Sequence, residues 1–345
     1  LALAQQFAKA VDGVLVDATP PPKQMQLALA SRFKIMSSLD IAERRLPQDG
    51  RMRVRVGGKD YDLRVSILPT VHGEKIVLRV LDKSNLSASI DKLGLDPDTF
   101  QQFKGAVDAP HGLILVTGPT GSGKTTTLYS ALNELNNPIY NIVTVEDPVE
   151  FQIPGINQVP VKKEIGLSFA NALRSILRQD PDIVMIGEIR DTETAEIAIE
   201  AALTGHQVLS TMHCNDAPGA IARLDDMGIA PFLISSSVIL SCAQRLMRRI
   251  CSHCKEPVTY PAKMYQDLNI DPSIFDGVTL YRGRGCDRCK GSGYSGRLAI
   301  IEAMTITDEV RKLVIARANT REMGKVAIGQ GMKTLRMVAL DRARD

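Results

Sequence analysis

A glycine-rich segment of this 345-residue chain has the residue types and spacing needed to bind phosphate. From Gly118 to Thr125 the sequence reads GPTGSGKT, which fits the pattern G-x-x-x-x-G-K-[ST]. An apolar run precedes it at 112–117, and a segment with helical spacing follows at 125–135. Glycines let backbone amides close around phosphates, and the next helix presents its partly positive N-terminus. The segment therefore predicts a nucleoside triphosphate site rather than a plain tight turn.

Two side chains of this loop have specific expected roles. Lys124 would reach the β- and γ-phosphates, and the Thr125 hydroxyl would ligate Mg²⁺. The nucleotide-binding residues expected here are Gly118, Pro119, Thr120, Gly121, Ser122, Gly123, Lys124, Thr125 and Thr126.

Acidic side chains follow two further apolar runs. Glu146, Asp147 and Glu150 come after the run at 141–145, and Glu188 comes just after the run at 183–186. In phosphate-loop ATPases one carboxylate near the phosphates holds Mg²⁺ or its waters, and another polarises the attacking water. Acidic residues at strand ends also cap turns and face water, which is the structural alternative. The sequence leaves open which glutamate is the base and which is the Mg²⁺ partner.

Basic side chains near these segments are further candidates. His206 and His213 stand at the two ends of a short apolar run, where a histidine can sense a phosphate or serve the structure. Arg174 and Arg178 lie one turn apart on an amphipathic helix expected over 168–178. That helix runs directly into the Glu188 strand, so we expect it near the catalytic edge. Its arginines would then neutralise phosphate charge or, alternatively, decorate a solvated face.

Four of the six cysteines form two C-x-x-C pairs, Cys251/Cys254 and Cys286/Cys289. Two such pairs predict a tetrahedral Zn²⁺ held by four thiolates, with no open position for a substrate. Glycines surround the second pair, as a metal-binding turn requires. A redox dithiol or unreactive reduced cysteines are the alternatives.

Composition limits the possible classes. The net charge is +3, there is no Trp, and aromatic residues make up 4%, which disfavours a base-stacking platform for single-stranded nucleic acid. No apolar stretch reaches the roughly 20 residues that span a bilayer. The first ten residues look helical and lack the features of a signal peptide. We therefore expect a fragment of a longer cytosolic protein.

The chain is long enough for about two domains. Alternating segments at 51–56, 61–67 and 76–81, with a Gly57-Gly58 turn and a helix at 27–36, predict a small α+β domain. Arg64 and Arg79 would point away from its core. From residue 100 onward, strands at 112–117, 141–145, 183–186 and 208–211 alternate with helices, which predicts a covered parallel sheet with its ligand site at the strand carboxyl ends. After residue 216 we expect mostly helix around the cysteine module, with the basic segment 245–249 at a solvated helix end.

Taken together, these residues resemble the secretion ATPase superfamily of type II secretion and type IV pilus machines over almost the whole chain. The resemblance rests on the phosphate loop and on the segments 144–150, 183–191, 205–216 and 35–51. It implies an α/β protein with a PAS-like α+β N-terminal domain at 1–83, a linker at 84–99 and a RecA-like P-loop ATPase domain at 100–345. The zinc module would occupy about 245–300. That module is typical of pilus-assembly and type II secretion members and absent from typical retraction members.

The resemblance also implies roles for single residues. Glu146 would be the catalytic base, Glu188 the Walker B carboxylate, and His206 and His213 active-site residues beside Lys124. The arginines implied to reach nucleotide phosphate are Arg64, Arg79, Arg174, Arg178 and Arg190. The partners implied are five further copies in a homo-hexamer and an inner-membrane platform protein, with ATP, Mg²⁺ and Zn²⁺ as ligands. The protein would lie on the cytoplasmic side of the inner membrane.

Other functions remain open at this point. Pilus assembly is favoured over type II secretion as the process that ATP turnover drives. A nucleic-acid translocase would need basic channel loops, and 245–249 is the one tight basic cluster near the expected core. We expect no nucleic-acid partner. A non-hydrolytic nucleotide switch is the third possibility.

Overall fold

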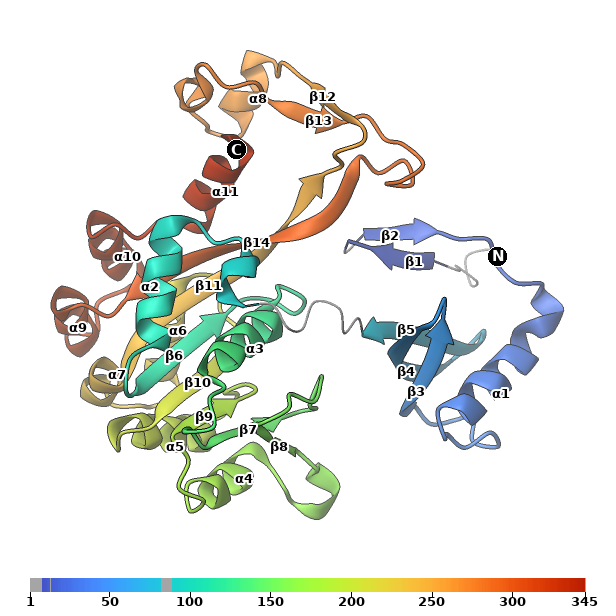
Figure 1. The fold of residues 1–345 in the computed structure, drawn as a ribbon, viewed down its shortest axis with the longest axis horizontal. Helices are drawn as coiled ribbons and strands as arrows, with labels where there is room; N and C mark the ends of the chain where they lie inside the picture. Colours follow the sequence, from blue (N-terminus) through green and yellow to red (C-terminus); the bar gives the residue numbers. More distant parts are fainter. Residues whose placement is uncertain (1–7, 13, 82–88, 345) are drawn as a thin grey trace. The chain divides into compact units, whose positions relative to one another are not determined.

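The computed structural model describes residues 8–12, 14–81 and 89–344, and the chain divides into two units, Leu1–Leu86 and Ser87–Asp345 (Figure 1). Each unit has its own hydrophobic core. Within the described residues, no helix combines the length and the apolar character that a membrane span requires.

The first unit is an α+β domain built on a three-stranded antiparallel sheet. Its strands run in the order β3–β4–β5 and its core contains Met52, Leu63, Val65 and Ile67. The elements are β1 (Ala8–Val11), β2 (Val14–Asp17), the short 3-10 helix η1 (Lys23–Met25), α1 (Gln26–Met36), β3 (Gln48–Val56), β4 (Lys59–Thr70) and β5 (Gly73–Leu81). The strands and helix expected for this domain are confirmed. The helix expected at the start of the chain is not, because Ala8–Val11 is a strand paired with Val14–Asp17; residues 1–7 lie outside the described residues.

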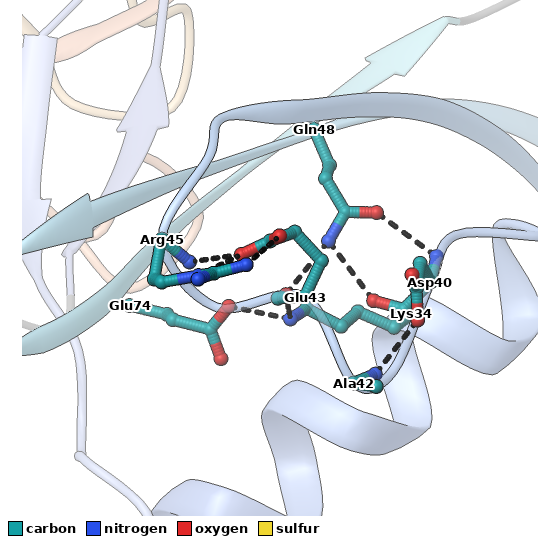
Figure 2. A network of polar contacts seen from close by, with 7 residues as sticks. All are labelled: Lys34, Asp40, Ala42, Glu43, Arg45, Gln48 and Glu74. Carbon is teal, nitrogen blue, oxygen red and sulfur yellow. Dashed lines mark hydrogen bonds and ion pairs between the residues drawn. The ribbon is translucent and has the colours of Figure 1, made fainter.

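A buried lysine joins the helix of this unit to its sheet. Lys34 of α1 is 1% exposed, and its ammonium group forms an ion pair with Glu74 of β5 at 2.6 Å (Figure 2). The same nitrogen donates to the Glu43 carbonyl at 2.6 Å, and Gln48 also donates to that carbonyl. A buried charge is tolerated only when it is paired and hydrogen-bonded, so this network fixes how α1 lies against the sheet.

The second unit is an α/β domain with a seven-stranded sheet in the order β14–β11–β6–β10–β9–β7–β8. Its strands are β6 (Gly112–Thr117), β7 (Ile142–Glu146), β8 (Asn157–Pro160), β9 (Ile183–Ile186), β10 (Gln207–Met212), β11 (Val238–Ile250), β12 (Lys255–Pro257), β13 (Tyr281–Gly283) and β14 (Tyr294–Thr305), of which β12 and β13 form a separate pair. Its α-helices are α2 (Pro97–Val107), α3 (Lys124–Leu135), α4 (Phe169–Ile176), α5 (Thr192–Leu203), α6 (Ala217–Asp226), α7 (Pro231–Ser237), α8 (Ala262–Asp267), α9 (Asp308–Ile315), α10 (Thr320–Gly329) and α11 (Leu335–Arg344). Three 3-10 helices complete the unit: η3 (Ile90–Leu93), η4 (Lys163–Ile165) and η5 (Pro272–Phe275).

The central strands confirm the expected parallel sheet. Every residue of β6, β7, β9 and β10 is buried, and these strands pair in parallel. Strands buried on both faces read as continuous apolar runs, which is why the sequence pattern located them. Their carboxyl ends lie at one edge of the sheet, so the segments that follow β6, β7, β9 and β10 meet there.

The region after residue 216 contains the expected helices, α6 to α11, but also strands that were not expected. Its two longest elements are strands, β11 and β14, which pair antiparallel from Leu240–Thr305 to Ile250–Tyr294. They extend the central sheet and lead toward the β12–β13 pair (Figure 1). The basic segment 245–249 therefore lies on a strand. In β11, buried Ser, Cys and Gln interrupt the apolar pattern, so no alternation marked it as a strand.

The expected linker at 84–99 also differs from the structure. Ile90 and Leu93 of η3 are buried, and Asp96 accepts a hydrogen bond from the Thr99 amide at the start of α2. Residues 89–99 are thus an ordered part of the second unit. Residues 84–88 lie outside the described residues.

Candidate functional site

The phosphate loop follows β6 in the middle of the sheet and leads into α3. Gly118, Gly121 and Gly123 have φ values of 147°, 80° and 91°, conformations that side chains other than glycine rarely adopt. Lys124 is the first residue of α3, and its ammonium group donates to the Gly118 and Pro119 carbonyls at 2.7 and 3.2 Å. Thr125 and Thr126 are exposed at the helix N-terminus. All nine expected loop residues therefore lie in one turn whose amides and lysine can surround a phosphate.

A buried glutamine holds this loop from a strand far along the chain. Gln244 of β11 donates to the Ser122 carbonyl at 2.9 Å and accepts from the Thr127 hydroxyl at 2.8 Å. A Cβ on Gly123 would come within 2.8 Å of the Gln244 amide, so only glycine leaves room for the contact. Gln244 was not predicted as part of the site, because nothing in the local residue pattern of β11 marks it.

Glu188 lies beside the loop. It comes two residues after β9, and backbone hydrogen bonds from Gly187 to Val145 and from Ile189 to Thr211 hold it between neighbouring strand ends. Its carboxylate pairs with Arg190 and lies 3.6 Å from Nε2 of His213, which follows β10. The ion pair with Glu188 raises the pKa of Arg190.

The electrostatics connect Glu188 with the phosphate loop. Burial lowers the pKa of Lys124, and the nearby Glu188 carboxylate opposes that effect. Arg245 of β11 adds a further positive charge that lowers it. Lys124, Arg190, Glu188 and His213 thus belong to one edge of the sheet, where Asp147 adds a second carboxylate near Arg190.

Glu146 ends β7 and is held in a closed hydrogen-bond network. The side chain is 3% exposed, and its carboxylate accepts from the Tyr129 hydroxyl, from the Thr144 hydroxyl at 2.6 Å and from the Gln158 amide at 3.0 Å. Gln158 also donates to the Phe151 carbonyl at 2.9 Å, which ties the segment after β7 to the same group. The sequence predicted Glu146 but not Tyr129 or Gln158.

His206, Arg174 and Arg178 lie elsewhere in this unit. They line one pocket, together with Leu177, Ile197, Glu200 and Thr204. His206 comes immediately before β10 and His213 immediately after it, so seven residue steps along the strand separate them by about 23 Å at roughly 3.3 Å per residue. The strand thus separates His206 from His213, while Arg174 pairs with Glu193 in the first turn of α5. Helix α4 carries Arg174 and ends at Ile176, two residues before Arg178, and the chain then leads into the start of β9.

Arg64 and Arg79 of the first unit belong to a row of three arginines. The strand register places Arg51 of β3, Arg64 of β4 and Arg79 of β5 directly opposite one another, on the face away from the core. In the next rows Arg53 pairs with Asp62 at 2.9 Å and Arg55 with Asp60 at 2.6 Å. Within the described part of the chain, no ion pair or hydrogen bond of the Arg51 or Arg79 side chain is present. Like charges directly opposite destabilise a sheet, so this row is suited to bind an anion.

The four paired cysteines form one cluster. Their sulfur atoms all lie within 4.8 Å of one another, with Sγ–Sγ distances of 3.9 Å for Cys251–Cys286, 3.8 Å for Cys254–Cys289 and 3.7 Å for Cys286–Cys289. Tetrahedral Zn²⁺ with bonds of about 2.3 Å needs sulfur atoms about 3.8 Å apart, so the donor set fits this ion. His253 contacts Arg288 instead and is not part of the cluster.

Glycines allow the tight turns around this cluster. A Cβ on Gly283 would come within 1.9 Å of the Gly293 carbonyl oxygen, so these two backbones can cross only without side chains. The amides of Cys286 and Gly293 donate to the Cys289 sulfur at 3.1 and 3.2 Å, as expected for a thiolate ligand.

Comparison with known proteins identifies relatives over almost the full chain. The family described as Type II/IV secretion system protein matches residues 5–345. The chain is 54% identical to the type IV pilus assembly ATPase PilB of Myxococcus xanthus over 97% of its length, and 50% identical to PilB of Thermus thermophilus over 96%. It is 48% identical to the type II secretion system ATPase E of Vibrio cholerae over 97%. The chain spans 60%, 38% and 66% of these relatives, respectively.

Solved structures show the same fold. The pilus retraction motor PilT with bound ADP aligns with 98% of this chain and 90% of its own, at 25% identity and a TM-score of 0.60. The ATPase DotB of Legionella pneumophila aligns with 98% of this chain and 85% of its own, at 19% identity and a TM-score of 0.61. The expected α/β ATPase fold is thereby confirmed.

Proposed function

The chain belongs to the Type II/IV secretion system protein family, and from this premise we propose that it is an ATP-hydrolysing motor that drives type IV pilus assembly. The observation that carries the proposal is the meeting of Lys124 with Glu188 and Arg190 at the carboxyl edge of the parallel sheet. This arrangement places a phosphate-binding turn, a carboxylate and positive charge where phosphoryl transfer requires them.

The residues at this edge of the sheet have different roles in hydrolysis. The loop amides and Lys124 bind the β- and γ-phosphates, while Thr125 and Glu188 would hold Mg²⁺, which would neutralise phosphate charge. A water oxygen attacks the γ-phosphorus, the bond from that phosphorus to the ADP oxygen breaks, and the water proton passes to Glu146. A carboxylate offers about four acceptor positions, and the three donors on Glu146 leave one for this proton. Arg190 and His213 stabilise the charge around Glu188.

The row of arginines on the first unit supplies further positive charge. Arg64 and Arg79 contact nucleotide phosphate in a homo-hexamer, and the strand register that sets Arg51, Arg64 and Arg79 opposite one another supports this role. Zn²⁺ bound by the four cysteines stabilises the β12–β13 segment without taking part in the reaction. The motor acts on an inner-membrane platform protein from the cytoplasmic side.

Type II secretion is the second candidate function. The similarity to the pilus assembly ATPase of M. xanthus, 54%, exceeds that to the type II ATPase of V. cholerae, 48%, and this difference favours the pilus machine. The four-cysteine cluster is compatible with both.

Two measurements test the proposal. The purified protein should hydrolyse ATP, and Lys124→Ala should lower the turnover by about 10²–10³-fold because it removes one preorganised positive charge. DNA should not stimulate turnover. Turnover that persists in the Lys124→Ala protein, or that requires DNA, would refute the motor proposal.

Gene deletion separates the two processes in cells. Loss of surface pili with normal enzyme secretion supports pilus assembly, and the opposite result supports type II secretion. A Glu188→Gln allele should reproduce the deletion while the purified variant still binds ADP. An allele that restores full function would instead favour a non-hydrolytic switch.

A further inference from the structure

The Glu146 carboxylate is fixed by residues from three different segments. Thr144 is on its own strand β7, Gln158 is on β8, and Tyr129 is on α3. Thr144 and Gln158 donate to one carboxylate oxygen, Oε1, and Tyr129 donates to the other, Oε2. The tyrosine therefore determines the rotation of the carboxylate about its bond to the side chain.

The Tyr129 side chain is buried and packs against a second aromatic ring. It is 1% exposed, and its ring packs edge-to-face against Phe151, with ring centroids 6.4 Å apart. Burial and the Glu146 charge raise the pKa of Tyr129, so its hydroxyl stays protonated at neutral pH and donates. A buried hydroxyl without a hydrogen-bond acceptor would destabilise the folded state, and the Glu146 carboxylate provides the acceptor for Tyr129.

The helix that carries Tyr129 also carries the phosphate-binding lysine. Lys124 begins α3, and Tyr129 follows five residues later on the same rigid element. A nucleotide held by Lys124 and the loop amides is therefore joined to the Glu146 carboxylate through one helix and one hydrogen bond.

We propose that Tyr129 is a positioning residue that sets the orientation of the Glu146 carboxylate relative to the bound nucleotide. The inference rests on the proposed role of Glu146 as the base. Because Tyr129 acts through Glu146, it affects the rate of the chemical step and not the affinity for nucleotide.

Tyr129→Phe in the whole protein tests the inference, because phenylalanine keeps the ring and its contact with Phe151. We expect kcat to fall about ten- to hundredfold, in line with the cost of misplacing a reacting group, while KM for ATP and Kd for ADP change less than about twofold. Tyr140→Phe is the matched control, since Tyr140 is exposed on the same unit and should leave kcat unchanged. An unchanged kcat in Tyr129→Phe, or equal losses in kcat and ADP affinity, would overturn the inference.

A double-mutant cycle separates positioning from a general structural effect. In a Glu146→Gln protein the added Tyr129→Phe change should cause no further loss of kcat, because the group it orients is no longer a base. An additional loss of the full size would show that Tyr129 acts elsewhere. If Glu146→Gln alone keeps full turnover, the proposed role of Glu146 fails, a result distinct from failure of the tyrosine contact.

A second variant addresses folding. Phe151→Leu disturbs the same packing but keeps the Tyr129 hydroxyl. If the two variants have similar melting temperatures, Phe151→Leu should retain the wild-type kcat, whereas Tyr129→Phe should have a lower kcat. Equal losses in both variants would assign the effect to packing and refute positioning.

Discussion

Gln244→Leu should loosen the phosphate loop from a strand more than a hundred residues away in sequence. The substitution keeps most of the side-chain volume but removes the donor to the Ser122 carbonyl and the acceptor for the Thr127 hydroxyl. Gln244 is 1% exposed and Ser122 is 4% exposed, so water does not readily replace the lost partners.

The size of the effect follows from these two contacts. Each neutral hydrogen bond contributes about 1 kcal/mol, and a buried carbonyl left without its donor costs about 1–3 kcal/mol. Thr127 keeps a weaker contact, because its hydroxyl also lies 3.5 Å from the Gly123 carbonyl. We therefore expect a loss of about 2–4 kcal/mol in the stability of the second unit. If half of the lower value, about 1 kcal/mol, is lost from the nucleotide-binding conformation of the loop, the Kd for ADP rises about fivefold.

Urea unfolding followed by circular dichroism measures the first quantity, and calorimetric titration with ADP measures the second. Gln207→Leu is the matched control, since Gln207 is a buried glutamine of β10 whose amide donates to the Ala106 and Val107 carbonyls at 3.0 and 3.2 Å, at the edge away from the loop. It should lower stability by a similar amount and leave the Kd for ADP unchanged. Wild-type ADP affinity in Gln244→Leu, or an equal loss of affinity in the control, would refute the reasoning.

Three further predictions concern other parts of the molecule. Arg79→Ala should lower kcat far more than ADP affinity, whereas Arg53→Ala, which removes an arginine already paired with Asp62, should leave kcat near wild type; equal effects of the two changes would argue against the anion-binding row. The purified protein should contain one Zn²⁺ per chain, and chelation or Cys286→Ser should lower the melting temperature without removing ADP binding, while Cys214→Ser, outside the cluster, serves as control; absence of metal would disprove the zinc site. Burial raises the pKa of Glu302 in the folded protein. The contribution of Glu302 to the unfolding free energy should therefore fall as the pH rises from its pKa in the unfolded chain, about 4.3, toward its raised pKa in the folded protein. Glu302→Gln should flatten the dependence of unfolding free energy on pH in that window, and an unchanged slope would contradict this assignment.

Local patterns explain what the sequence predicted correctly. The phosphate loop, the buried strands before it and before Glu188, and the paired cysteines are all defined by residues a few positions apart. Their chemistry depends on that spacing, so the pattern and the geometry agree. The four sulfur atoms did come together, although β12 and β13 were not foreseen.

Contacts between distant segments explain what the sequence did not predict. Gln244 meets Thr127 across 117 residues, and Tyr129 meets Glu146 across 17, with no motif to link them. The placement of Arg174 and Arg178 depended on the direction in which α4 approaches β9. A helical spacing shows which face of a helix is apolar, but not at which end of the following strand the helix finishes.

Strand β11 imposes a length constraint that joins two otherwise separate parts of the protein. Gln244 contacts the phosphate loop from its middle, and Cys251 of the sulfur cluster comes directly after its last residue, Ile250. The pairing of β11 with β14 is regular up to Arg248 and shifts before Ile250, and successive side chains of a regular strand point to opposite faces, so removing one residue from 245–248 would reverse the facing of the segment that leads to the cluster. Removing two would restore the facing but shift the pairing with β14. Among relatives that retain both contacts, the four positions 245–248 should therefore show substitutions but no insertions or deletions.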